Sequence, residues 1–179
     1  IFGGISYILP DAKHNIDFLV SFPGFYEAFK AGLDLPNSTS SKWQCVRSTN
    51  NPNVYAAAVE FGKDITRKID QLSAQSVDAI LIYIPEEYEF LTAYSDGSEK
   101  FDLHDYVKAY AAQRQVATQF VRQKTIDSEL HCQIMWALSL ALYVKSGRIP
   151  WTITGTQPDT AFAGIGYSVM RGANKNNVV

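Results

Sequence analysis

The stretch that decides the fold runs from Phe101 to Gly147 and reads FDLHDYVKAYAAQRQVATQFVRQKTIDSELHCQIMWALSLALYVKSG. It predicts a helix, a short strand and a second, longer helix. Asp102 has the side chain of a helix N-cap, and Asp105 lies in the favourable first turn of a helix that runs to about Arg114. This part of the chain therefore has the order helix, strand, helix.

The strand and the second helix are predicted from side-chain type and spacing. Residues 116–121 are β-branched and aromatic enough for a strand. Lys145 lies in the last turn of the second helix, which Gly147 and Pro150 bring to an end. The candidate N-caps of that helix are Thr125, Asp127 and Ser128, and its apolar stripe consists of Ile134, Leu138, Ala141 and Leu142.

Four polar side chains of this stretch are expected to converge. His104 and Lys108 stand four residues apart and share one helical face. The strand is expected to place Gln119 close to its carboxyl end, and Lys145 follows at the end of the second helix. In a parallel sheet, ligands sit beyond the carboxyl ends of the strands. The set holds one imidazole, two ammonium groups and one amide but no carboxylate, which suits a bound phosphate.

This set resembles the phosphate pocket of the MID domain of Argonaute proteins. In that pocket, four residues bind the 5′-phosphate of a guide strand: a tyrosine or histidine, a lysine, a glutamine and a second lysine. The residues that match this motif in identity, order and approximate spacing are His104, Lys108, Gln119 and Lys145. Histidine at the first position is similar to the variant of short prokaryotic Argonautes. Residues 22–25, FPGF, followed by Phe29 and Leu33, also resemble an element near the start of the MID region of short Argonautes.

The resemblance implies a function and partners. It implies that the four residues bind the 5′-phosphate, while Arg122 and Lys124 contact the guide backbone. It implies Mg²⁺ joining phosphates of the guide, a short RNA guide (or a DNA guide), and a complementary DNA target. It also implies a partner chain with a TIR-like or sirtuin-like effector domain, acting in prokaryotic immunity.

The resemblance further divides the chain into a MID domain over residues 1–150 and the beginning of a PIWI domain over residues 151–179. Residues 160–172, TAFAGIGYSVMRG, are similar to the first strand of a PIWI domain, which has a ribonuclease-H-like fold. Gly166 stands where that family places its first metal-binding aspartate. Glycine has no side chain to hold a metal ion, so the resemblance implies target binding without cleavage.

Strand and helix patterns alternate along the chain, which predicts an α/β domain with a mostly parallel sheet flanked by helices. The MID resemblance implies that this domain is Rossmann-like. The acidic residues after Pro85 are expected to begin a helix rather than to bind a metal. Residues 95–100 are expected to form a polar loop. The other expected strands are 5–9, 43–47 and 78–84, and the other expected helices are 11–20, 24–33 and 54–72.

Composition is that of a globular protein, with 46% hydrophobic residues and a net charge of −2. Residues 1–100 hold 8 basic and 13 acidic side chains, and residues 101–179 hold 8 and 5, so a local anion site fits better than a broad basic surface. Cys45 and Cys132 are expected to be buried thiols in a reducing cytosol. No signal peptide or membrane span is expected, which favours the cytoplasm. The chain lacks an initiator Met, so we expect it to be a piece of a longer protein.

Two other interpretations of the residues stay open. One is a scaffold domain whose anion pocket is vestigial and which holds a partner chain. The other is an enzyme that acts on a nucleotide or a phosphosugar. No GxxxxGK[ST] loop, GxGxxG turn or Gly-x-Ser-x-Gly elbow is present, which disfavours the enzyme. Binding of 5′-phosphorylated against 5′-hydroxyl guides separates guide anchoring from the scaffold.

Overall fold

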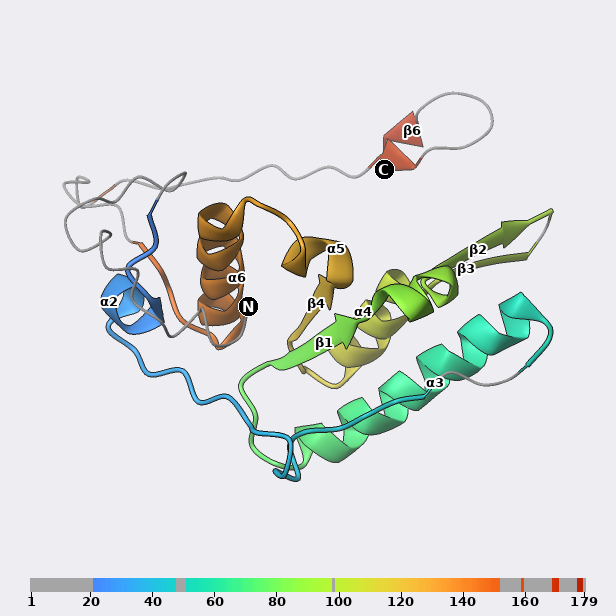
Figure 1. Cartoon of the computed structure of the whole chain (residues 1–179), viewed down its shortest axis with the longest axis horizontal. Coiled ribbons are helices and arrows are strands. Elements are labelled where there is room, and N and C mark those ends of the chain that lie inside the picture. Colours follow the sequence, from blue (N-terminus) through green and yellow to red (C-terminus); the bar gives the residue numbers. More distant parts are fainter. Residues whose placement is uncertain are drawn as a thin grey trace.

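The protein has a mixed α/β fold around a small parallel sheet (Figure 1). The computed structural model describes residues 21–47, 51–97, 99–151, 159, 169–170 and 177–178. Strand β1 (Ile80–Ile84) pairs in parallel with β4 (Thr118–Arg122), and Ile80 lies opposite Thr118. Helices cover both faces of this pair, as the alternation of strand and helix patterns predicted.

One face of the sheet packs against α3 (Val54–Ser73) and α4 (Leu103–Gln113). Asn53 begins α3, because its side-chain oxygen accepts a hydrogen bond of 2.9 Å from the Ala56 N–H. The apolar stripe of α3 is buried against α4 and β1, except Val54 in its first turn, which is exposed. The buried core of this face consists of Ala57, Ala58, Phe61, Ile65, Ile69, Leu72, Ile80, Ile84, Leu91, Leu103, Val107 and Ala111.

The other face of the sheet packs against α2 (Phe25–Phe29) and α6 (His131–Lys145). Val121 of β4 is buried here with Phe25, Leu138 and Leu142. The α2 helix is shorter than the predicted helix over 24–33, because Lys30 adopts a left-handed conformation and ends it. Of the predicted α6 stripe, Leu138 and Leu142 are buried, while Ile134 and Ala141 are half-buried.

A β-hairpin, which the sequence did not predict, precedes α4. Strands β2 (Ala93–Asp96) and β3 (Glu99–Asp102) pair antiparallel where a polar loop was expected at 95–100, so that prediction was wrong. Gly97 has a φ of +55°, which a tight turn between the strands requires and glycine adopts without strain. The 3-10 helix η2 (Glu86–Leu91) follows β1, and a third pair joins β5 (Val169–Met170) to β6 (Asn177–Val178).

Several predictions about local structure were wrong. Residues 43–47 form no strand; a strand needs a partner, and β1 and β4 pair with each other instead. Cys45 is exposed and Cys132 half-buried, so neither is the buried thiol that was expected. The α6 helix begins at His131 without a side-chain cap, because residues 123–126 form the separate short helix α5 (Gln123–Ile126). The expected caps at 125–128 therefore precede α6.

Other predictions fall outside the described residues. These are the strand over 5–9, the helix over 11–20 and the PIWI-like stretch from residue 160 to residue 168, which includes Gly166. In the described part, none of the helices combines the length and apolar character needed to cross a membrane.

Candidate anion-binding site

The α4 helix brings His104 and Lys108 toward β4. The Asp102 side chain caps this helix as predicted, because its Oδ1 accepts a hydrogen bond of 2.9 Å from the Asp105 N–H. His104 and Lys108 follow on one face of the helix. The His104 ring lies against the Phe120 ring, with 5.4 Å between their centroids. The Lys108 Nζ donates a hydrogen bond to the Thr118 carbonyl.

The Thr118 carbonyl belongs to the edge of β4 that faces away from β1. The Ile80 N–H donates to the Ala117 carbonyl at 2.8 Å. In a parallel ladder, alternate residues then direct their backbone groups toward the partner strand. Ala117 and Gln119 therefore point theirs toward β1, whereas Thr118 and Phe120 point theirs toward the opposite edge. Lys108 thus binds the edge of β4 that β1 leaves open.

Gln119 and Lys145 complete the group at this edge. Lys145 is the last residue of α6, and its Nζ donates to the Gln119 Oε1. The Gln119 Nε2 donates in turn to the Phe120 carbonyl at 2.9 Å. One of the two amide hydrogens of Gln119 is left for a ligand. The four residues predicted from the sequence are thus gathered around β4 by two helices.

The two lysines repel each other, and this shows in the pKa of Lys145. Burial, which is the larger cause, and the neighbouring Lys108 ammonium together lower that pKa from 10.5 to about 8. In the part of the chain that the structure describes, neither lysine takes part in an ion pair. Two adjacent cations without an acidic partner among the described residues make this group a candidate site for an anion.

The site was expected at the carboxyl edge of the sheet, but it lies elsewhere. Gln119 is the second residue of β4, because the strand begins at Thr118 and continues to Arg122. The carboxyl ends of β1 and β4 instead border an open cleft of about 500 Å³. Three carboxylates make that cleft unsuitable for phosphate; its lining is Pro85, Glu86, Glu87, Gln123 and Asp127.

The two residues expected to contact a guide backbone lie elsewhere and are paired. Arg122 Nη1 forms an ion pair of 2.7 Å with Glu89 Oε1, and Lys124 Nζ lies 3.9 Å from the same oxygen. Glu89 belongs to η2, near the carboxyl end of β4. Both basic side chains therefore have an acidic partner, whereas Lys108 and Lys145 bind only uncharged oxygens among the described residues.

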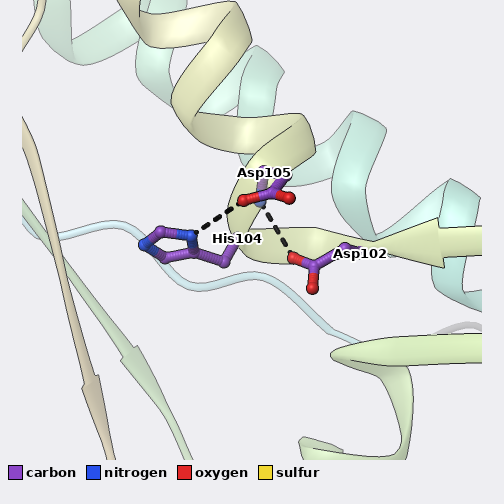
Figure 2. A group of neighbouring side chains, drawn as sticks. All are labelled: Asp102, His104 and Asp105. Atoms are coloured by element: carbon purple, nitrogen blue, oxygen red, sulfur yellow. Dashed lines mark hydrogen bonds and ion pairs between the residues drawn. The ribbon is translucent and has the colours of Figure 1, made fainter. Parts of the chain in front are cut away.

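A second group of side chains has the composition to hold a metal ion. Figure 2 shows Asp102, His104 and Asp105 at the start of α4, and their ligand atoms lie within 4.8 Å of one another. All three are exposed, and His104 Nδ1 lies 3.3 Å from Asp105 Oδ1. Because the group includes an imidazole, it suits Zn²⁺ better than Mg²⁺, which prefers oxygen ligands. The lysine site itself offers no carboxylate for Mg²⁺.

Two contributors to the site were missed by sequence reasoning. The backbone carbonyl of Thr118 holds Lys108, and the Phe120 ring supports His104. Every residue has a backbone carbonyl, so the sequence does not show which one is free to bind a lysine. Phe120 was counted only as part of the strand over residues 116–121, but it also packs against the core that β1 and α4 share.

A comparison with models of protein families finds none that matches this chain, and a search of curated proteins finds no relative that is significantly similar.

Proposed function

We propose that this chain is the guide-anchoring part of a short prokaryotic Argonaute. In this proposal it binds the 5′-phosphate of a short guide RNA (or guide DNA), for recognition of a complementary DNA target in prokaryotic defence. The observation that supports it is the proximity of Lys108 to Lys145 beside Gln119, with neither lysine in an ion pair among the described residues.

The electrostatics of this group favour a ligand over a structural role. Two adjacent ammonium groups cost stability, and a carboxylate in place of Gln119 would remove that cost. A terminal phosphate carries a charge of about −1.5 to −2, which matches the charge of the two lysines. The amide of Gln119 binds an anion by donating a hydrogen bond without cancelling either charge. Such a group is most stable when an anion occupies it.

Each residue has a role in the proposal. Lys108 and Lys145 neutralise the phosphate. Gln119 turns its amide nitrogen toward a phosphate oxygen once Lys145 leaves its Oε1. His104, supported by the Phe120 ring, lies beneath the first base of the guide or donates to the phosphate when protonated. Contact of Arg122 or Lys124 with the guide backbone would require them to leave Glu89.

The wider assignment rests on the sequence resemblance. We propose a Rossmann-like MID domain over residues 1–150, and over residues 151–179 the beginning of a ribonuclease-H-like PIWI domain that does not cleave its target, because Gly166 replaces an aspartate. Mg²⁺ would bind between phosphates of the guide, which supply the oxygen ligands that the lysine site lacks. A partner chain with a TIR-like or sirtuin-like domain would carry the effector activity, in the cytoplasm.

The experiment that tests this function compares a short RNA that bears a 5′-phosphate with the same RNA that bears a 5′-hydroxyl. The intact parent protein should prefer the phosphate. A hydrogen bond to a charged group contributes roughly 1.5 to 3 kcal/mol, so Lys108→Ala should weaken phosphate-dependent binding about 10-fold to 100-fold. Lys63→Ala is the matched control, because it removes an exposed lysine of α3 outside the site.

Equal binding of the two RNAs by the wild-type protein would overturn guide anchoring. The scaffold interpretation would then account for the domain, since that interpretation does not need the phosphate.

A further inference from the structure

A cleft with a basic lining lies between α3 and the extended segment that precedes it. Residues 41–47 run along α3 in the opposite direction (Figure 1), and the Ser41 hydroxyl donates a hydrogen bond of 2.8 Å to the Gln75 Oε1 just after the end of α3. The cleft has a volume of about 270 Å³, and its lining consists of Cys45, Val46, Arg47, Asp64, Arg67, Lys68 and Gln71. None of these residues belongs to the lysine site around β4, so the cleft is a separate feature of the molecule.

The lining of the cleft holds three cationic side chains and one carboxylate, which leaves an excess of two positive charges. Asp64 forms an ion pair with Arg67, one turn further along α3. Lys68 Nζ donates to the uncharged Gln71 Oε1 at 3.2 Å, and among the described residues neither Lys68 nor Arg47 has an acidic partner. An exposed ion pair within one helix is weak, so Arg67 can exchange Asp64 for another anion at little cost. Phosphate suits this lining, because a guanidinium group binds two of its oxygens at once.

The segment that forms one wall of the cleft also exposes an aromatic ring. Exposure alternates along this segment: Trp43, Cys45 and Arg47 are exposed, while Gln44 and Val46 are half-buried. An extended chain has this period, because every second side chain points to the same side. Trp43, which is 45% exposed, therefore projects on the same side as Arg47 and lies about 7 Å along the segment from Cys45 in the cleft wall.

We propose that the cleft and Trp43 together form a binding surface for single-stranded nucleic acid. A backbone phosphate occupies the cleft, where it contacts Arg47, Arg67 and Lys68, and a neighbouring base stacks on the Trp43 ring. Proteins that bind single strands without sequence preference combine a basic groove with exposed aromatic side chains in this way. A free phosphate ion would use the cations alone, so the aromatic ring beside the cleft favours a strand. The inference goes beyond the proposed guide anchoring, because it uses no residue of the lysine site.

The first measurement is binding of a labelled short single-stranded DNA that carries a 5′-hydroxyl to the intact protein. Trp43→Ala should weaken binding about 5-fold to 100-fold, whereas Trp43→Phe, which keeps an aromatic ring, should retain most of it. This DNA lacks the 5′-phosphate that the lysine site is proposed to bind, so Lys108→Ala should leave its affinity unchanged. Loss of binding in Lys108→Ala would place the strand at the lysine site and overturn the inference, and an unchanged affinity in Trp43→Ala would overturn the stacking contact.

The dependence of the same binding on salt tests the cations of the cleft. Each phosphate contact of a single strand contributes about −0.7 to the slope of log affinity against log salt concentration, so Arg47→Gln should make the slope shallower by about 0.7. Lys100→Gln is the matched control, because it makes the same change of charge on an exposed residue of β3. Asp64→Asn removes the carboxylate of the cleft and should strengthen binding. Equal slopes for the wild type and Arg47→Gln would overturn the role of the cleft.

The thiol of Cys45 reports whether the strand lies in the cleft. Alkylation with iodoacetamide, followed by peptide mass spectrometry, gives the reaction rate at Cys45 in the cleft and at Cys132 in α6. Bound DNA should slow the reaction at Cys45 and leave the rate at Cys132 unchanged. Inorganic phosphate, at the same concentration of phosphate groups, should protect Cys45 much less. Equal protection by inorganic phosphate would overturn the nucleic-acid part of the inference, and an unprotected Cys45 at saturating DNA would overturn the cleft as the site.

Discussion

Lys108 lies close enough to Lys145 for its charge to act on it, although the helices that carry the two lysines cover opposite faces of the sheet. They meet at the edge of β4 that β1 leaves open. There, Lys108 binds the Thr118 carbonyl and Lys145 binds the Gln119 side chain. Because the described sheet has β1 on only one side of β4, two helices bring like charges together at its other edge, and most of the expected properties of the site follow from that proximity.

Binding of a phosphate should weaken as the pH rises through about 8. Below that pH both lysines are charged, and above it Lys145 loses its proton in the free protein. Affinity for a 5′-phosphorylated RNA, measured between about pH 7 and pH 10 at constant ionic strength, should therefore fall with rising pH. Lys145→Arg should shift the fall to higher pH, because arginine keeps its charge. A wild-type affinity that stays flat over this range would contradict the charge requirement.

The stability of the fold should depend on pH through the same residue. Lys145 has a pKa of about 8 when folded and 10.5 when unfolded, so between these values the unfolded chain binds more protons. Stability then rises with pH over that window, and the penalty is fully present below about pH 8. After allowance for solvent screening, the gain is about 1 kcal/mol. Denaturant unfolding of the wild type and Lys145→Met should show the gain in the wild type only.

Gln119→Glu should make the protein more stable and less able to bind phosphate. A carboxylate at this position pairs with Lys145 and relieves the repulsion between the lysines, a gain of up to about 1 kcal/mol. The same charge repels a phosphate, so the preference for a 5′-phosphate should disappear. Thermal unfolding and RNA binding on one preparation measure both effects. Gln119→Leu, which lacks the charge, should lose binding without the rise in stability.

The capping residue of α4 should matter through its oxygen rather than its charge. Asp102→Ala removes the acceptor of the Asp105 N–H and should cost about 1 kcal/mol of unfolding free energy. Asp102→Asn keeps an acceptor oxygen and should cost much less. Denaturant unfolding of the two variants measures the difference. Equal losses would mean that the carboxylate charge at the helix N-terminus contributes more than the hydrogen bond.

Local sequence patterns predicted the main elements because those elements depend on nearby residues. The apolar spacing of α3, the Asp102 cap of α4 and the apolar run of β1 each produced the expected element. The β2–β3 hairpin was missed because its strands are short and exposed, with no apolar alternation to reveal them. Residues 43–47 had strand-like side chains but found no partner strand.

The sequence by itself predicted which four side chains make up the candidate site and which helices and strand carry them. This was possible because an anion site needs hydrogen-bond donors and no carboxylates, and both can be identified from the residue types alone. Only the tertiary structure decided that the site lies at the edge of β4 that faces away from β1, and that Lys108 and Lys145 share it. Pairing between β1 and β4 determines which backbone carbonyls of β4 remain free to bind a side chain. Packing of α4 and α6 on the two faces of the sheet determines where their lysines lie. Both depend on contacts between residues far apart in the chain, which local patterns do not contain.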